Sequence, residues 1–554
     1  MRSKAALAAL LLALTLVLAQ DLAPGPQVLT FFSSVDDSDQ PYAVYVPPNL
    51  DRSVKYPLVI SLHGENSNHR VNLRQVFGKG ARMGQTVAEA SPYFPKLPDV
   101  PFLVAAPLSR GAMGLQGIAE KDVYDVLADM KRRFPIDDDR LYLTGVSSGA
   151  GFALKLALTR PSLWAGVVLV CPRLPDDLAP LAVNAANIPI QIYQGELDPL
   201  VPAVDTRDWQ RRLLDAGVNV DYIEYPRVRH NVWDTAYAGA RIFEWFDKHR
   251  NPRFPARVRF VTYQYRYSSA YWITLDRLNP GTAGTIDARF LGPNQLSVKT
   301  QAVDAFTLHL AGHPSFSPAR PVQLQIDQAK LTLKPAASLS FRRTGQTWKQ
   351  GLSKPSDAEK RPGLEGPIPE AIADRHIYVY GTAGNPSDRE RERRREQAEK
   401  ASEWSTSRAR LLLTFKVVSD RELKPGEEKQ ANLILLGTRE TNAVIARLSP
   451  QLPMVLNAGA ADFGLTYITP VNGRYILVSS GLPWWTGADQ TQRAAGVNLR
   501  PPYPPWRVLE TFQDYILFKG SLETIIAEGR FQNDWSLSPP DAAKIKATGA
   551  VQLR

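Results

Sequence analysis

The chain has 554 residues and a formal net charge of +11, with 66 Lys and Arg against 55 Asp and Glu. A chain of this length is expected to form two or three domains with ample cores. The single cysteine, Cys171, excludes an intramolecular disulfide, so core packing has to supply the stability. The positive charge suits an acidic polysaccharide, a cell envelope or simply solubility.

The first 19 residues have the pattern of a secretory signal peptide. A basic start precedes an apolar run over residues 5–18, and Val17-Leu-Ala19 forms a small-residue cleavage signature before Gln20. A membrane anchor is the alternative, but the run is shorter than the roughly 20 residues that a spanning helix needs. We therefore expect a secreted or periplasmic protein with no stable membrane insertion after cleavage and no nucleic-acid partner.

Residues 20–252 are predicted to form an α/β domain, because short apolar runs alternate with helical patterns. Alternation of this kind predicts a mostly parallel sheet that helices cover on both faces. Such strands need to be short and apolar, because both of their faces are buried. The strand-like runs are Tyr42–Val46, Tyr56–Leu62, Phe102–Ala106, Leu141–Leu143, Ala165–Val170, Ile188–Tyr193 and Val218–Tyr225.

Three further segments are predicted after this domain. Residues 253–337 hold successive strand-like runs separated by Gly, Pro and Asn, which is typical of a small β-sandwich. Residues 338–374 are rich in Pro, Lys and Gly and are expected to form a linker. Residues 375–554 return to alternating strands and helices, which predicts a second, small α/β domain with a parallel sheet.

A short motif in the first domain has the spacing of a nucleophile elbow. In Gly145-Val-Ser147-Ser-Gly149, a serine is expected on a sharp turn between a strand and a helix. The context agrees, because Leu141–Leu143 reads as a strand and Phe152–Leu158 as an apolar helix. Glycines flank the serine because a Cβ at those positions would keep the strand and the helix apart. Ser147 is therefore the candidate nucleophile.

A serine hydroxyl is a weak nucleophile at its ordinary pKa and needs a base that a carboxylate orients. Asp198 follows the strand-like run that ends at Tyr193, and His230 follows the run that ends at Tyr225. The order Ser, Asp, His, each after a strand, is a known order of a catalytic triad. We predict Ser147 as nucleophile, His230 as general base and then acid, and Asp198 as the group that fixes the tautomer of His230.

These motifs make the N-terminal domain resemble the secreted esterase and prolyl-oligopeptidase-like branch of the α/β-hydrolases. That branch includes feruloyl-esterase-like and polyhydroxybutyrate-depolymerase-like enzymes. The resemblance rests on Leu62-His-Gly64, Leu143–Gly149, Gly195–Pro202 and His230–Trp233.

The resemblance also implies an oxyanion hole, formed by the backbone N–H groups of Ser148 and of Glu65 or Gly64. The sequence departs from the family's pattern in two places. Arg229 stands where the residue before the histidine is usually Gly, and Gly149-Ala-Gly151 replaces two adjacent glycines. Neither departure removes a catalytic atom. Arg229 could narrow the site or supply a cationic contact, so it bears on substrate preference more than on activity.

The resemblance implies an exported serine hydrolase that cleaves a small or polymer-linked carboxylic ester through an acyl-enzyme, with no metal and no organic cofactor. A serine peptidase of the prolyl-oligopeptidase type is the first alternative, because the same triad serves amides. Such peptidases normally carry a β-propeller before the catalytic domain, which begins here almost at the mature N-terminus. An inactive hydrolase-like scaffold that binds a polysaccharide or envelope component is the second alternative, and the complete triad argues against it.

Two other sets of residues are expected to be structural. Cys171 follows an apolar run and is expected to be a buried strand residue that packs as a small hydrophobe. His309 and His313 are four residues apart, which suits a metal ion only on a helix, whereas the sequence around His309 predicts a strand. We therefore expect no metal site at these histidines.

Overall fold

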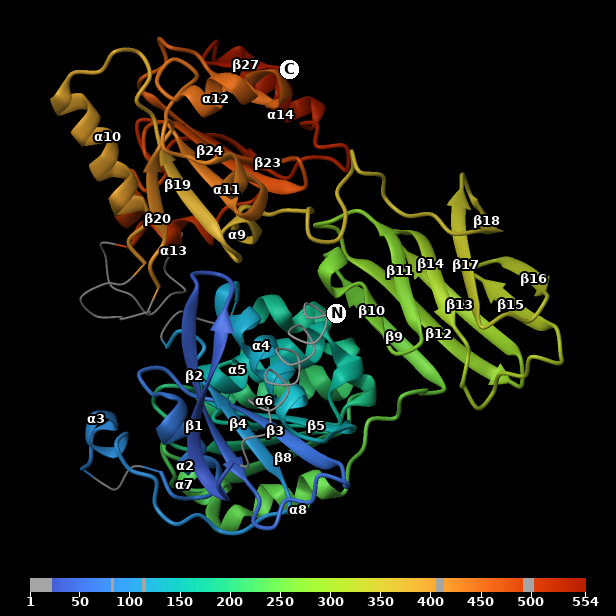
Figure 1. The fold of residues 1–554 in the computed structure, drawn as a ribbon. Coiled ribbons are helices and arrows are strands. Elements are labelled where there is room, and N and C mark those ends of the chain that lie inside the picture. The colour runs from blue at the N-terminus through green and yellow to red at the C-terminus, as the bar shows by residue number, and fades with distance from the viewer. Residues whose placement is uncertain (1–21, 81–83, 112–115, 405–412, 492–502) are drawn as a thin grey trace, which may run out of the picture. The chain divides into compact units, whose positions relative to one another are not determined.

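The computed structural model describes residues 22–80, 84–111, 116–404, 413–491 and 503–554, so the predicted signal peptide lies outside the described residues. The chain divides into two compact units (Figure 1). Of the described residues, the first comprises 22–32, 39–80, 84–111 and 119–260, and the second comprises 33–38, 116–118, 261–404, 413–491 and 503–554. Within the described ranges, no helix combines the length and the apolar character needed to cross a membrane.

An eight-stranded sheet of order β1-β2-β4-β3-β5-β6-β7-β8 forms the centre of the first unit. β2 pairs antiparallel with β4, and the strands from β4 to β8 pair in parallel. The strands are β1 (Gly25–Ser33), β2 (Ser38–Val46), β3 (Tyr56–Leu62), β4 (Leu103–Pro107), β5 (Ile136–Val146), β6 (Gly166–Val170), β7 (Ile190–Gly195) and β8 (Val220–Tyr225). The predicted, mostly parallel sheet is confirmed.

Helices cover this sheet, and the burial of its strands follows from that. Every residue of β4, β6 and β7 is buried, as expected for strands covered on both faces. The helices are α2 (His69–Val76), α3 (Val87–Ala90), α4 (Ile118–Arg133), α5 (Ser148–Thr159), α6 (Ala203–Asp215), α7 (Trp233–Ala236) and α8 (Arg241–Asp247). A single hydrophobic cluster joins residues of α2 and α8 to the sheet, and the rings of Tyr142 and Phe246 lie 4.7 Å apart within it.

The second unit begins with a β-sandwich of two five-stranded sheets, of order β10-β11-β14-β17-β18 and β16-β15-β13-β12-β9. The strands are β9 (Arg257–Thr262), β10 (Ser269–Ala270), β11 (Ile273–Leu278), β12 (Gly284–Gly292), β13 (Gln295–Gln301), β14 (Val303–His309), β15 (Val322–Ile326), β16 (Ala329–Leu333), β17 (Ser338–Thr344) and β18 (Thr347–Gln350). Trp272 and Phe290, whose ring centroids are 5.5 Å apart, join the two sheets.

The sandwich extends further along the chain than the sequence predicts. Residues 338–350, assigned above to a linker, form β17 and β18, and β17 pairs with β14 through Phe306 and Phe341. The linker prediction is therefore wrong for this stretch. Leu339 and Phe341 are buried and alternate with more exposed residues, so the strand is held by a short alternating pattern that the surrounding Pro, Lys and Gly obscure.

The second unit ends in a seven-stranded sheet of order β20-β19-β21-β24-β23-β25-β26. Its strands are β19 (His376–Tyr380), β20 (Lys416–Ser419), β21 (Asn432–Leu436), β23 (Phe463–Val471), β24 (Arg474–Gly481), β25 (Tyr515–Lys519) and β26 (Ile525–Gly529), and β22 (Met454–Leu456) pairs separately with β27 (Val551–Leu553). The helices are α9 (Ile368–Ala371), α10 (Asp388–Ala401), α11 (Pro425–Gln430), α12 (Ala443–Leu448), α13 (Pro505–Leu509) and α14 (Pro539–Ala547).

This sheet is mixed rather than parallel throughout. β20, β19, β21 and β24 pair in parallel, whereas β23 pairs antiparallel with β24 and β25, and β25 pairs antiparallel with β26. The prediction of a parallel sheet is wrong for these last strands. β23 and β24 are joined by the tight turn at Asn472-Gly473, both at positive φ, and such a turn permits only antiparallel pairing.

A buried ion pair lies within the second unit. Lys360 Nζ is 2.5 Å from Asp514 Oδ2, and both side chains are fully buried. The same carboxylate oxygen accepts a hydrogen bond of 2.9 Å from the Phe531 backbone, and the Trp535 ring lies 5.2 Å from the ammonium. Burial lowers the pKa of the Lys360 amine, and the neighbouring Asp514 charge opposes that shift.

Candidate active site

Ser147 occupies the turn between β5 and α5 in a strained backbone conformation. Its φ is 56° and its ψ is −119°, outside the regions that non-glycine residues ordinarily adopt. The Ser147 N–H donates to Val170 O at 2.9 Å, and the Arg173 N–H donates to Ser147 O at 3.1 Å. The end of β6 therefore holds the serine in this conformation, as strained functional residues require.

The two motif glycines are required by close backbone contacts. A Cβ on Gly145 would lie 2.3 Å from Gly149 O, and a Cβ on Gly149 would lie 2.3 Å from Leu62 O. No side chain fits at such distances, so the turn can close only on glycine. The turn consequently packs directly against the end of β3.

The residues predicted for the oxyanion hole border this turn. A Cβ on Gly64 would lie 3.2 Å from Val146 O and 3.5 Å from Ser147 Cβ, which places the loop after β3 beside the serine. Ser148 is the first residue of α5, so its N–H has no acceptor within the helix. Glu65 follows Gly64 directly and has an exposed side chain.

Asp198 and His230 form a hydrogen-bonded pair. The distance from His230 Nδ1 to Asp198 Oδ2 is 2.7 Å, and the carboxylate is completely buried while the imidazole is 16% exposed. The other carboxylate oxygen accepts the N–H groups of Leu200 and Val201, both at 2.9 Å. Because the carboxylate is fixed from both sides, it determines the orientation of the imidazole ring.

Close backbone contacts also join the loops that carry this pair. A Cβ on Gly195 would lie 2.4 Å from Arg229 O, and the Leu197 N–H donates to Val228 O at 2.9 Å. The Trp233 ring packs edge-on against the His230 ring, with centroids 5.6 Å apart. Arg229, where the sequence departs from the family's pattern, is exposed beside the histidine.

Cys171 connects the serine turn to the Asp198–His230 pair. Its sulfur, a carboxylate oxygen of Asp198 and a ring nitrogen of His230 all lie within 4.8 Å of one another. The Ser147 N–H donates to the carbonyl of Val170, the residue before Cys171. Burial raises the pKa of the thiol well above its usual value. The structure therefore gathers Ser147, Asp198 and His230 around one buried cysteine.

Sequence reasoning placed Cys171 in the core but missed this location. The residue directly follows β6 and has a φ of 40°. The carboxyl ends of parallel strands meet at one edge of a sheet, where ligands bind in open α/β sheets. Its place immediately after the strand is thus the signal that could have grouped it with the other three residues.

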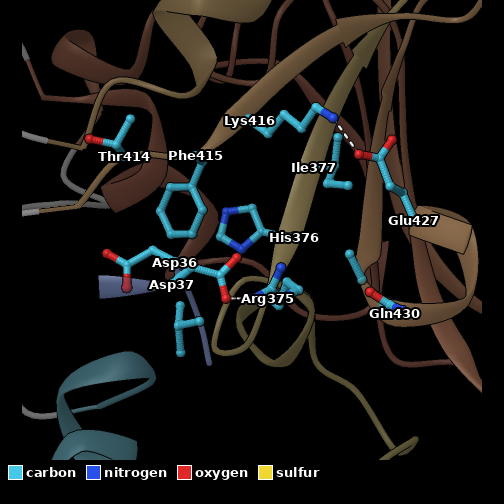
Figure 2. A pocket seen from close by; sticks show the side chains of 12 residues that line it. Asp36, Asp37, Arg375, His376, Ile377, Thr414, Phe415, Lys416, Glu427 and Gln430 are labelled. Carbon is cyan, nitrogen blue, oxygen red and sulfur yellow. Dashed lines mark hydrogen bonds and ion pairs between the residues drawn. The ribbon is translucent and has the colours of Figure 1, made fainter. Parts of the chain in front are cut away.

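A hollow lies elsewhere in the chain, and its lining residues all belong to the second unit (Figure 2). Its volume is about 310 Å³, and the buried His376 lies in its wall stacked on Phe415. Four of its charged groups are paired, because Arg375 contacts Asp37 and Lys416 contacts Glu427. The hollow lacks the nucleophile, base and carboxylate arrangement found after β5, β7 and β8, so the site after those strands is the candidate active site.

Comparisons with known proteins agree with this geometry. Residues 119–243 match the family model described as phospholipase/carboxylesterase, a range that includes Ser147, Asp198 and His230. The fold of the first unit is that of the α/β-hydrolases. This match and the topology of the sheet confirm the predicted resemblance and support a serine hydrolase. A search of curated proteins found no match.

Solved structures similar to this chain include two esterases and a further hydrolase. A thermostable esterase has 24% identity and a TM-score of 0.32, with 41% of this chain and 63% of that chain covered, so the likeness spans less than two thirds of that protein. A ferulic acid esterase from Anaeromyces mucronatus, solved with ferulic acid, has 17% identity, coverages of 42% and 93%, and a TM-score of 0.31. A puromycin hydrolase has 16% identity, coverages of 42% and 41%, and a TM-score of 0.31.

Proposed function

We propose that this protein is a carboxylic ester hydrolase that works through a Ser147–His230–Asp198 triad and an acyl-enzyme. The observation that carries the proposal is the 2.7 Å pair of His230 Nδ1 and Asp198 Oδ2, beside the strained turn that presents Ser147. Such an arrangement supplies a nucleophile, a base and the group that orients the base.

In the proposed reaction, the Ser147 hydroxyl attacks the ester carbonyl while His230 accepts its proton. The N–H groups of Ser148 and of Glu65 or Gly64 stabilise the negative oxygen of the tetrahedral intermediate. His230 then gives the proton to the leaving alcohol, and Asp198 stabilises the imidazolium. Water, deprotonated by His230, releases the acid from Ser147 and restores the enzyme.

The proposed substrate is a small or polymer-linked ester. The positive net charge of +11 supports contact with an acidic polysaccharide or an envelope component, and we propose that this contact brings the enzyme to a polymeric substrate.

A fluorophosphonate probe tests the reaction class, because it attaches only to an activated serine. We expect the wild-type protein to be labelled on the peptide that contains Ser147 and Ser147→Ala to remain unlabelled. Both proteins should then be assayed on short p-nitrophenyl esters and on peptide amides. Cleavage of amides would replace the esterase with a peptidase, and an unlabelled wild-type protein would leave only a binding scaffold.

We also propose export, on the basis of the basic start and apolar run over residues 1–19. The full-length chain, expressed in a secreting host and recovered outside the cytoplasm, is expected to begin at Gln20. Mass spectrometry of the intact protein gives this terminus directly. Recovery of the chain only from the membrane fraction, with residues 1–19 still attached, would instead support the anchor.

A further inference from the structure

Three side chains of the proposed catalytic centre also form a set of ligands for a soft metal ion. Cys171, His230 and Asp198 offer one sulfur, one nitrogen and one oxygen, all within 4.8 Å of one another. Zinc is bound in proteins by these three donor types. Cys171 has no part in the proposed ester hydrolysis, so the function leaves its presence at this place unexplained.

The distances fit one tetrahedral ion after a small adjustment. With metal–ligand bonds of about 2.0–2.3 Å, two ligand atoms of the same ion lie about 3.5 Å apart. The pairs therefore have to close by about 1.3 Å at most, starting from the limit of 4.8 Å. The 2.7 Å bond between His230 and Asp198 has to open by a similar, smaller amount.

The three groups differ in exposure, and the most exposed one gives a dissolved ion a way into the site. Cys171 is fully buried and the Asp198 side chain has no exposed area, whereas the His230 side chain is 16% exposed. The imidazole is therefore the group that a dissolved ion meets first. A ring held by one hydrogen bond and an edge-on contact with Trp233 moves more easily than the backbone of Cys171, directly after β6.

We propose that a soft divalent cation, Zn²⁺ or Cd²⁺, binds to Cys171, His230 and Asp198 and reversibly switches off the proposed hydrolase. Binding replaces the thiol proton of Cys171, which passes to solvent. Where the ion takes Nδ1 of His230, the proton of that nitrogen moves to Nε2 through solvent, and a water molecule completes the coordination. Both ring nitrogens of His230 are needed for hydrolysis, one to hold Asp198 and one to accept the proton of Ser147. A metal ion on either nitrogen therefore stops turnover, so this inference rests on the proposed function.

Cadmium binding can be read without any enzyme assay, because a cadmium–thiolate bond absorbs in the ultraviolet and the chain has one cysteine. Titration of the full-length protein with Cd²⁺ alone is expected to give one such bond per chain. Cys171→Ser and Cys171→Ala should both lose the absorption, with circular dichroism checking that each variant is folded. Ser147→Ala should keep it, because Ser147 is not a ligand.

Ester hydrolysis gives the second readout. Each protein is compared with its own metal-free rate, and Cd²⁺ is expected to reduce wild-type turnover at least a thousandfold at saturation, reversed by a chelator. The concentration that halves the rate should rise at least about tenfold in Cys171→Ser. The matched control is His309→Gln, an exposed histidine of β14, which should leave that concentration unchanged.

The outcomes separate the two proposals. No thiolate absorption in a protein that hydrolyses esters overturns the metal site and leaves the hydrolase standing. Thiolate absorption in a protein with no esterase activity supports the metal site and overturns the proposed hydrolase. If Cd²⁺ inhibits Cys171→Ser as strongly as wild type, the inhibiting ion binds elsewhere, and the proposed metal site is overturned.

Discussion

Ser147→Ala is expected to lower turnover of short p-nitrophenyl esters at least a thousandfold, because the variant has no nucleophile for the acyl-enzyme. The substitution removes one oxygen and leaves the turn in place, since alanine fits wherever serine does. The measurement is the steady-state rate over a range of ester concentrations. Ser162→Ala, at another half-buried serine of the first unit, is the matched control and should stay within about threefold of wild type.

A double variant shows whether the residues act as one unit. Asp198→Asn alone should also lose on the order of a thousandfold or more, because the asparagine no longer selects the correct tautomer of His230. Ser147→Ala combined with Asp198→Asn should be no slower than Ser147→Ala alone. Losses that multiply would mean that Asp198 and Ser147 contribute independently and do not act as one unit, and a fully active Ser147→Ala would exclude the triad.

Lys360→Met is expected to lower the free energy of unfolding of the second unit by about 3–5 kcal/mol, because it leaves the buried Asp514 charge without its partner. A methionine follows the path of the lysine carbons but supplies no positive charge. Urea titration of the full chain, read by hydrogen exchange in peptides of β25, measures this loss where it occurs. Far smaller destabilisation would contradict the prediction that this buried ion pair contributes substantially to stability.

Two comparisons isolate the charge effect. Lys519 and Asp462 form an exposed pair with 3.5 Å between Nζ and Oδ2. Lys519→Met should therefore lower the free energy of unfolding by less than about 1 kcal/mol. Asp514→Leu in the Lys360→Met background removes the stranded charge and should recover much of the loss, since apolar pairs often replace buried ion pairs without penalty. A double variant as unstable as Lys360→Met would assign the effect to packing.

The first domain and its proposed triad were accessible from sequence because two local patterns agreed. Short apolar runs fixed where the strands end, and Ser147, Asp198 and His230 each follow such an end. The hairpin strand β1 was not predicted, because Gly25–Ser33 contains Phe31 and Phe32 side by side instead of a clean alternation. Local periodicity thus predicted the positions of the proposed triad but did not predict the edge strand β1.

What sequence reasoning missed depends on contacts between distant residues. Nothing near Cys171 in the chain shows that its sulfur meets Asp198 and His230, because β7, β8 and the loops after them bring those residues there. Likewise, the direction of β23 and β25 depends on strand pairing, which hydrophobic periodicity does not specify. The buried partner of Lys360 lies 154 residues away and has no local signal.

The glycines of the first unit have a consequence for changing its substrate range. Gly145, Gly149 and Gly195 set the spacing of the reactive groups through direct backbone contacts that leave no room for a Cβ, so a mutational library gains nothing from varying them. The loop side chains that point outward, such as Leu197 and Leu200, are free of that constraint. Substrate selectivity can therefore be changed by substituting these exposed loop side chains, while the glycines keep the spacing of the proposed triad.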